Sequence, residues 1–452
     1  MHHWRVTSAT HPTRASLPVF AAAALILTTV AACGSSGPTP RPSSGPTTPP
    51  PPTLVTTATP GASLSAVPSI VAIPTSAYAA PTHPPIHLND ALAASLQKTV
   101  TTLQASKLFP GLSVAVAFPD GSIWAGQSGK AILSSRTPLT TDTLFSFGSV
   151  SKTFVAALVG RLAQRGTIGL DDPLSKYVPT FYRAADITVR QLLNHTSGVM
   201  DLFAVPGMGA AILADPTRVW TPEQVLAKVA RSRYAFAPGK GYKYSNTDYV
   251  LLGVVIEKAT GQTVASLVRS EFLTPLGLTH TFLQTEETAE GPVAHGYMTP
   301  ASKPRDNSAG SMLPFTAEAT VVGPAGGYVS TPTDLARWGS ALYGGQILDE
   351  ATLASMVDIS QTSGFKAPFR PTWVYGLGLE ETTINGQVVW GHRGHLDGFW
   401  SSMWYMPVYG ITIVVVANAE WCDPVAVTAA LAKALLPAAP APSAAAPSQP
   451  AP

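Results

Sequence analysis

Cysteine and acidic residues are scarce or unevenly placed in this chain. Only Cys33 and Cys422 occur among 452 residues, so a zinc site built from several cysteines is excluded. No Asp or Glu occurs before position 90 or after position 436, and the 25 basic and 26 acidic residues of 89–436 leave that part nearly neutral. A nearly neutral domain has no electrostatic footprint for a phosphate backbone, so we expect no nucleic-acid partner.

Proline divides the chain into segments. Fourteen of the 42 prolines lie in 34–88 and six in 437–452, whereas 89–436 holds the near-normal number of 20. The Pro/Ser/Thr-rich stretch 33–88 has no period that could bury a face and predicts a tether, and the Pro/Ala-rich end 437–452 predicts a disordered tail. The folded domain is expected at 89–436, which is long enough for one large domain or two lobes.

Residues 1–32 predict a secretory signal, because basic residues without any acid precede an apolar stretch that is too short to span a membrane. The stretch ends Val30-Ala-Ala-Cys33-Gly, which resembles the lipobox of bacterial lipoproteins. The resemblance implies that Cys33 is acylated and anchors the protein to the outer face of the bacterial cytoplasmic membrane. Cys422 would then have no disulfide partner. The alternative is an ordinary signal peptide that is cleaved near Ala32 and leaves Cys33 free.

The periodicity of the middle predicts strands at both ends and helices between them. We therefore expect an α+β fold, in which an antiparallel sheet is flanked by N- and C-terminal helices and an all-helical lobe lies beside it. The expected helices are 91–107, 149–164, several within 171–270, and 425–436; the expected strands are 112–116, 123–125, 374–383, 387–390, 399–405 and 411–417, with an Asn385-Gly386 hairpin turn.

The most informative motif is Ser149-x-x-Lys152, at the start of an apolar helix. Residues three apart on a helix face can touch, and a serine hydroxyl becomes a good nucleophile only when a neighbouring base takes its proton. The same spacing occurs at Ser95 and Ser363, but neither residue opens a buried helix after a strand-like segment. The chain also has a single Tyr-x-Asn, Tyr244-Ser-Asn246, and a single His-x-Gly, beginning at His392.

In this order the three motifs resemble those of the penicillin-recognising serine hydrolases, the group of class C beta-lactamases, D-alanyl-D-alanine carboxypeptidases and beta-lactamase-like esterases. The resemblance covers roughly residues 91–436 and implies an active site between the sheet and the helical lobe. It implies that Ser149 attacks an acyl carbonyl and becomes acylated, that Lys152 holds or accepts its proton, and that Tyr244 acts as the shared general base. Asn246 would bridge Lys152 and the substrate amide.

The resemblance also assigns roles to the third motif. The backbone N–H groups of Ser149 and His395 would form the oxyanion hole, and Gly394 is the glycine of His-x-Gly. His392 stands where the beta-lactamases carry a lysine, so a permanent charge is replaced by a group with a reference pKa near 6.5. His392, His395 and Asp397 also match a His-x-x-His-x-Asp metal pattern. The His-x-Gly interpretation explains the same residues, so we predict no metal and no cofactor.

Arg393 departs from the family pattern, which has Thr or Ser there to help hold the substrate carboxylate. Arg393 would either meet a carboxylate by charge or point away from the site. The loss of the hydroxyl favours an esterase or related acyl hydrolase of small esters. The alternatives are a D-alanyl-D-alanine carboxypeptidase or weak class C-like beta-lactamase, acting on a peptide or lactam, and a non-catalytic penicillin-binding-like protein. We interpret His195-Thr-Ser-Gly as a structural, helix-ending turn that shapes the cleft.

Overall fold

The computed structural model describes residues 81–436, except 231, 285, 300, 309–315 and 366–372. The predicted signal segment, Cys33, the tether up to residue 80 and the tail 437–452 lie outside the described residues. The start of the described chain lies along the sheet, where the Thr82 and His83 N–H groups both donate to the Val408 carbonyl.

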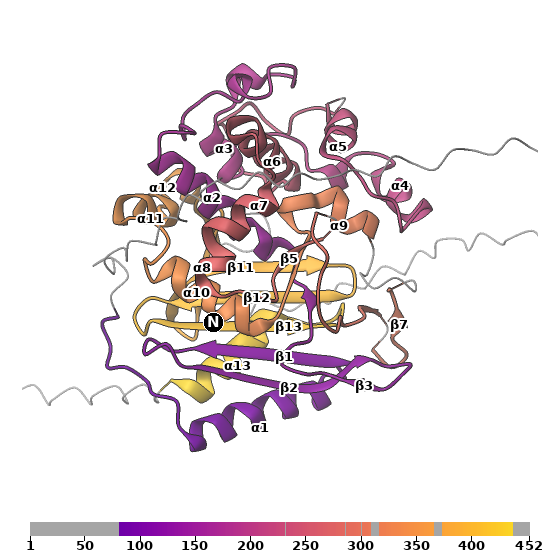
Figure 1. Ribbon diagram of the computed structural model, residues 1–452, viewed down its shortest axis with the longest axis vertical. Helices are drawn as coiled ribbons and strands as arrows, with labels where there is room; N and C mark the ends of the chain where they lie inside the picture. The colour runs from indigo at the N-terminus through magenta and orange to yellow at the C-terminus, as the bar shows by residue number, and fades with distance from the viewer. Residues whose placement is uncertain are drawn as a thin grey trace, which may run out of the picture. The chain divides into compact units, whose positions relative to one another are not determined.

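An eight-stranded antiparallel sheet forms the centre of the fold (Figure 1). The first and last described strands are neighbours inside it, with Val114 opposite Val415. In spatial order the strands are β3 (Thr137–Pro138), β2 (Ile123–Ile132), β1 (Gly111–Ala117), β13 (Ile411–Ala417), β12 (Phe399–Met406), β11 (Gln387–Leu396), β10 (Glu380–Ile384) and β9 (Val374–Tyr375).

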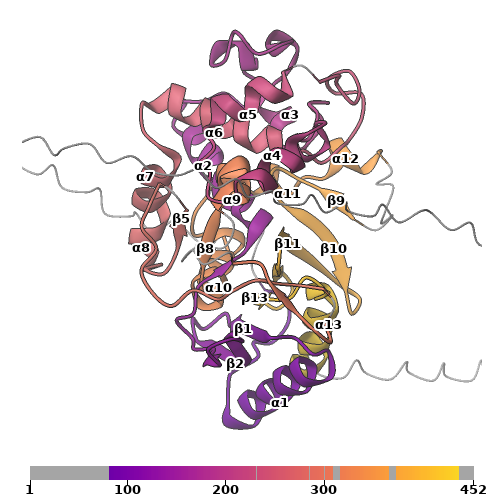
Figure 2. The same ribbon diagram turned by 90° about the vertical axis from the view of Figure 1, so that its right-hand side faces the viewer.

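The N- and C-terminal helices, α1 (Asp90–Ser106) and α13 (Pro424–Leu435), pack side by side on one face of this sheet (Figure 2). Leu96 of α1 and Leu431 of α13 are buried in one core with Val114 of β1, whereas the next residue, Ala115, belongs to the core on the opposite face. This alternation is what a strand with both faces covered requires, because successive side chains point to opposite sides.

The opposite face carries α10, α2 and the helical lobe (Figures 1 and 2). Phe154 of α2 stacks on Trp338 of α10 with ring centroids 4.2 Å apart, which joins the lobe to the sheet. The helices are α2 (Lys152–Gln164), α3 (Val189–Leu193), α4 (Met208–Ala214), α5 (Pro222–Val229), α6 (Asn246–Thr260), α7 (Val264–Val268), α8 (Thr274–Leu276), α9 (Thr316–Val322), α10 (Pro332–Tyr343), α11 (Glu350–Val357) and α12 (Ser360–Ser363); the short strands are β4 (Phe145–Ser146), β5 (Phe282–Leu283), β6 (Tyr297–Met298), β7 (Arg305–Asp306) and β8 (Tyr328–Ser330).

The α+β prediction is confirmed, and so is the hairpin turn, in which Asn385 and Gly386 have φ of 50° and 79°. The single strand expected at 374–383 is wrong, because the chain bends between β9 and β10. The bend includes Gly378, with φ of 79°, where a Cβ would lie 2.2 Å from the Ala156 Cβ, so the turn lets α2 approach the sheet. Among the described residues no single helix is long and apolar enough to cross a membrane; α6 and the α7–α8 segment meet that test only together, with a 78° bend between them.

Candidate active site

Two glycines bring Ser149 against the end of β11. Gly148 has φ of 53°, and a Cβ there would lie 2.6 Å from the His395 backbone nitrogen. At Gly394 a Cβ would lie 1.8 Å from the Phe147 carbonyl oxygen, so no larger residue fits. The turn that begins α2 can therefore approach the strand closely, and this approach explains the glycine of the His-x-Gly motif.

Lys152 is fully buried and joins the first two motifs. Its Nζ lies 3.0 Å from the Ser149 Oγ, 2.8 Å from the Asn246 Oδ1 and 2.8 Å from the Ala325 carbonyl oxygen. The two carbonyl oxygens can only accept hydrogen bonds, so they take two N–H groups of the amine. In a neutral lysine the remaining position is the lone pair, and it faces the serine hydroxyl.

The protonation state of Lys152 agrees with this geometry. Burial lowers the pKa of its amine from 10.5 to about 7, and the carboxylates of Asp201, Glu380 and Asp248 offset part of that decrease. Asp201 also fixes the Asn246 amide, because its Oδ2 accepts from the Asn246 backbone N–H at 2.6 Å and from the side-chain Nδ2 at 3.0 Å. This leaves the Asn246 oxygen directed at the lysine.

Tyr244 completes the group around Ser149. Its ring centroid lies 4.8 Å from the Lys152 Nζ. Burial raises the pKa of the Tyr244 hydroxyl well above its usual value, and the hydrogen bond with Ser149 offsets part of the increase. The structure therefore brings Ser149, Lys152, Tyr244 and Asn246 together. Because Tyr244 is held as a phenol, it is suited to donate a proton rather than to act as the general base that the resemblance implied.

The His195 turn lies directly behind Tyr244. His195 is fully buried, and its ring centroid lies 4.4 Å from that of Tyr244. Its backbone has φ of 60°, in the turn that follows α3. Its Nδ1 lies 3.0 Å from the Asp248 Oδ2, and the Ser197 hydroxyl donates to the other Asp248 oxygen at 2.6 Å. The structure agrees with a supporting role for this turn. No motif in the sequence points to Asp201 or Asp248, since each is an isolated aspartate.

His392 lies in the second layer of the site, with its ring centroid 6.1 Å from that of Tyr244. Its Nδ1 donates to the Arg393 carbonyl oxygen, so its Nε2 accepts from the Tyr375 hydroxyl at 2.9 Å. Burial lowers the pKa of His392 to about 4. The expectation of a group that titrates near 6.5 is therefore corrected: the imidazole is neutral around pH 7.

Arg393 pairs with an acid of its own chain, Glu380, and is not left free for a carboxylate of a substrate. Its Nε and Nη2 donate to the two Glu380 oxygens at 3.0 and 2.8 Å, and its guanidinium carbon lies 3.8 Å from the Trp373 ring centroid. Glu380 is buried and satisfies the cation, so a carboxylate on the substrate would meet a neutralised charge.

The edge of β11 presents a row of backbone N–H groups. The Arg393 N–H donates to the side chain of Glu380, the first residue of β10, so strand geometry directs the N–H of residue 395 to the same edge, beyond the paired part of β10. The Asp397 N–H lies two residues further and donates to the Glu318 carboxylate. The His395 N–H thus faces the space next to Ser149, where the resemblance places the oxyanion hole.

A pocket of ≈ 220 Å³ opens beside Ser149. It is smaller than the roughly 300 Å³ at which pockets for drug-sized ligands begin, so it suits a small acyl group. A larger pocket of ≈ 320 Å³ lies against α10 and contains none of the motif residues. The lining residues of the smaller pocket are Ser149, Phe203, Tyr244, Asn246, Glu318, Val322, Gly326, His395 and Leu396.

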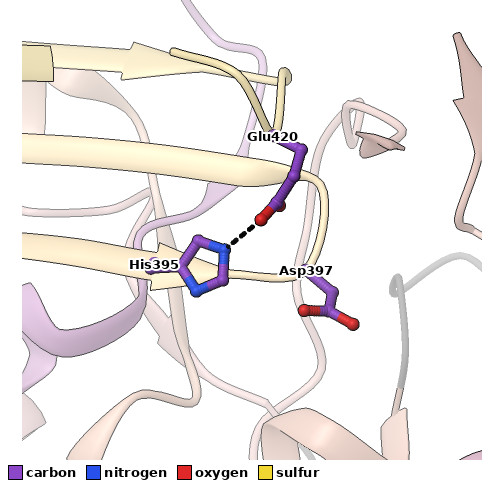
Figure 3. A group of neighbouring side chains, drawn as sticks. All are labelled: His395, Asp397 and Glu420. Carbon is purple, nitrogen blue, oxygen red and sulfur yellow. Dashed lines mark hydrogen bonds and ion pairs between the residues drawn. The ribbon is translucent and has the colours of Figure 1, made fainter. Parts of the chain in front are cut away.

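The residues of the alternative metal pattern separate in the structure. His392 has both ring nitrogens bonded to its own neighbours, whereas His395, Asp397 and Glu420 place their ligand atoms within 4.8 Å of one another. Figure 3 shows the His395 Nε2 paired with the Glu420 carboxylate, with the Asp397 carboxylate beside the pair and no interaction drawn to it; the His395 and Glu420 atoms lie 2.8 Å apart.

Comparison with known proteins gives consistent results. The Beta-lactamase family matches residues 96–436. The beta-lactamase of Escherichia coli (strain K12) is 27% identical over 379 residues, which cover 76% of this chain and 93% of that protein. The penicillin-binding protein 4* of Bacillus subtilis (strain 168) is 27% identical over 340 residues, 72% of this chain and 71% of that protein. A solved structure of D-amino acid amidase from Ochrobactrum anthropi SV3 superposes with a TM-score of 0.66 and 29% identity, over 76% of this chain and 98% of that one.

Proposed function

The chain belongs to the beta-lactamase family of serine hydrolases, and from this premise we propose that it hydrolyses small acyl esters and amides through an acyl-enzyme on Ser149. The observation that carries the proposal is the contact of the Lys152 amine with the Ser149 hydroxyl, while two carbonyl oxygens hold its other positions. This arrangement prepares the base and the nucleophile before a substrate binds.

In the acylation step the neutral Lys152 amine accepts the Ser149 proton as Oγ bonds to the substrate carbonyl carbon. The charge that develops on the carbonyl oxygen is stabilised by the N–H groups of Ser149 and His395. The Tyr244 phenol gives its proton to the departing alcohol or amine and regains one from the Lys152 ammonium. Water then attacks the acyl-enzyme, its proton passes to the same pair, and Ser149 leaves protonated.

The substrate preference follows from Arg393. In relatives a hydroxyl at this position helps to hold a substrate carboxylate, but here the side chain is an arginine whose charge Glu380 neutralises. Uncharged leaving groups are therefore preferred, which agrees with the esterase that the departure at Arg393 indicates. The similarity to a D-amino acid amidase supports the inclusion of amides.

A second candidate function is a D-alanyl-D-alanine carboxypeptidase or weak class C-like beta-lactamase. It is favoured by the similarity to a beta-lactamase and to penicillin-binding protein 4*. Release of D-alanine from a D-alanyl-D-alanine peptide, or opening of a lactam ring, at a rate above that of ester hydrolysis would support this candidate over the first.

The test of the proposed function is hydrolysis of p-nitrophenyl acetate, butyrate and hexanoate by the wild type, Ser149→Ala and Lys152→Ala. We expect the wild type to cleave a small ester and both variants to lose at least about a thousandfold in kcat. A cooperative thermal unfolding transition in each variant would show that it folds. Cleavage that survives in Ser149→Ala, or the absence of cleavage of every ester in the wild type, would count against the proposal.

We also propose that the protein is lipid-anchored through Cys33 at the outer face of the cytoplasmic membrane. The support is the small-residue sequence before Cys33 and the acid-free, proline-rich tether after it. In a bacterial host fed an alkyne fatty acid, we expect the wild type to be labelled and membrane-bound and Cys33→Ser to be neither. Labelling that persists in Cys33→Ser would contradict the assignment.

A further inference from the structure

Glu318 is a buried acid that the proposed chemistry does not use. It lies on α9, lines the same pocket as Ser149, and its side chain is 7% exposed. Both of its oxygens accept from the Asp397 backbone N–H, at 3.3 and 3.2 Å. Among the described ion pairs Glu318 takes part in none, although buried carboxylates are normally paired with a cation.

The surroundings of Glu318 favour a cation. Burial, followed by the charge of Asp397 and then that of Glu420, raises its pKa to about 8. His395 is the nearby group of opposite character, and its ring is already paired with Glu420. No lysine or arginine occurs among the described residues that line the pocket. A positive group brought in by a substrate would therefore lower the free energy of this part of the pocket.

The distance between Glu318 and the His395 N–H limits which positive group of a substrate can pair with Glu318. The His395 N–H lies on the open edge of β11, and the Asp397 N–H follows two residues later in the β11–β12 turn, at most about 7 Å away by the reach of two residues. A carbonyl oxygen at the first N–H is then separated from the Glu318 carboxylate by a similar distance. An α-ammonium lies about 3 Å from its own carbonyl oxygen, and one hydrogen bond adds about 3 Å, which together match the span.

The pocket is also suited to hold the acyl part of the substrate. The acyl group stays bonded to Ser149 after the leaving group departs, so it needs a space beside the nucleophile, and this pocket offers one. Phe203, Val322 and Leu396 give this space apolar walls, and Glu318 gives it an acidic one.

We propose that the pocket binds α-aminoacyl groups, with Glu318 as the residue that pairs with the substrate's free α-ammonium. The inference rests on the proposed function and narrows its substrate class to esters and amides of amino acids with a free amino group. A charge-assisted hydrogen bond at the α-position would hold the carbonyl against the His395 N–H and so act on kcat/KM.

The experiment compares two p-nitrophenyl esters, alaninate in both enantiomers and isobutyrate, in which a methyl group replaces the ammonium. Rates are corrected with Ser149→Ala. Glu318→Gln keeps the shape of the side chain and removes its charge, and Glu223→Gln, an exposed acid in the first turn of α5, is the matched control. We expect Glu318→Gln to lower kcat/KM for the better alaninate enantiomer by at least about tenfold and to leave isobutyrate within about twofold.

Each other outcome overturns a defined part of the inference. An equal loss on both esters would make Glu318 a structural residue. Loss of the alaninate preference in wild type treated with EDTA, and its return with Zn²⁺, would assign the acidic cluster to a metal ion instead. Hydrolysis of isobutyrate by every variant, with no preference for alaninate in the wild type, would refute the aminoacyl assignment alone. Absence of Ser149-dependent hydrolysis of both esters would refute the proposed function as well.

Discussion

Removal of the Asp201 charge is expected to let the enzyme work at lower pH. Asp201 lies one amide away from Lys152, because Asn246 donates to Asp201 at 3.0 Å and accepts from the Lys152 Nζ at 2.8 Å. The carboxylate favours the protonated lysine, and it is the largest of the charges that raise the pKa of that amine. In the proposed mechanism the neutral amine is the active form, so Asp201→Asn increases its fraction at a given pH.

The size of the shift can be estimated from the bridge. Two hydrogen bonds and the width of one amide separate the charges by about 7 Å, which corresponds to about 0.6 kcal/mol at the dielectric constant of water and about 2.4 kcal/mol at an effective value of 20. At about 1.4 kcal/mol per unit, the pKa of Lys152 falls by roughly 0.4 to 1.7 units. The wild-type midpoint lies near the pKa of about 7, so that of the variant lies below it.

The assay is the pH dependence of kcat/KM from pH 5 to 9 with a p-nitrophenyl ester. The wild-type value should rise tenfold per pH unit below the midpoint and then level off, because protonated lysine cannot accept the serine proton. The plateau value of kcat/KM is also lower in Asp201→Asn, because Asn246 loses its orienting partner. Only the midpoint of the pH profile tests the effect of the charge. Asp171→Asn, which removes an exposed acid paired with Arg190, is the control. A midpoint that moves upward or stays in place would refute the assignment of Lys152 as the base.

Three further predictions concern packing and charge. Gly394→Ala should lower the melting temperature and reduce kcat/KM by about a hundredfold, because its Cβ would lie 1.8 Å from the Phe147 oxygen and displace the turn that holds the nucleophile; normal values of both would show that the contact relaxes freely. Burial lowers the pKa of His392 to about 4, so as the pH falls the unfolded chain takes up this proton before the folded chain does. In urea denaturation, the free energy of unfolding of the wild type should therefore decrease by up to roughly 3 kcal/mol between pH 6.5 and 4, and His392→Gln should not show this decrease. Arg393→Thr should cost about 3–5 kcal/mol in urea denaturation because it leaves Glu380 buried without its partner, and adding Glu380→Gln should recover most of that loss; equal stability of the single variant and the wild type would contradict the pairing.

The fold and the reacting groups could be predicted because their signals are local in sequence. The period of the apolar residues predicts α1 and β13 nearly to their ends. The Asn385-Gly386 turn is predicted from the two residue types, and both residues have positive φ in the structure. Ser149 and Lys152 are one helical turn apart, so their contact follows from helix geometry. Only the family resemblance connected the motifs at Tyr244 and His392 with Ser149 and Lys152.

The supporting charges could not be predicted, because they act across the fold. Asp201 is distant in sequence from Lys152, and its effect depends on the orientation of Asn246. The pKa of His392 depends on burial that no short motif reports. Glu380 meets Arg393 through the register of the β10–β11 hairpin, which the turn residues alone do not fix, and Glu318 of α9 reaches the turn after β11 only when the helical lobe packs against the sheet. The neutralised Arg393 and the acidic pocket wall therefore could not be predicted from short motifs.

The acyl-enzyme on Ser149 is tested by locating the covalent intermediate in the chain. Wild type and Tyr244→Phe are mixed with p-nitrophenyl isobutyrate, quenched in acid, and examined by intact and peptide mass spectrometry. We expect the mass of one isobutyryl group on the peptide that contains Ser149, and none in Ser149→Ala. The adduct should accumulate more in Tyr244→Phe, because proton transfer during deacylation is slowed. Turnover with an adduct on a different residue, or turnover that Ser149→Ala retains, would contradict this assignment.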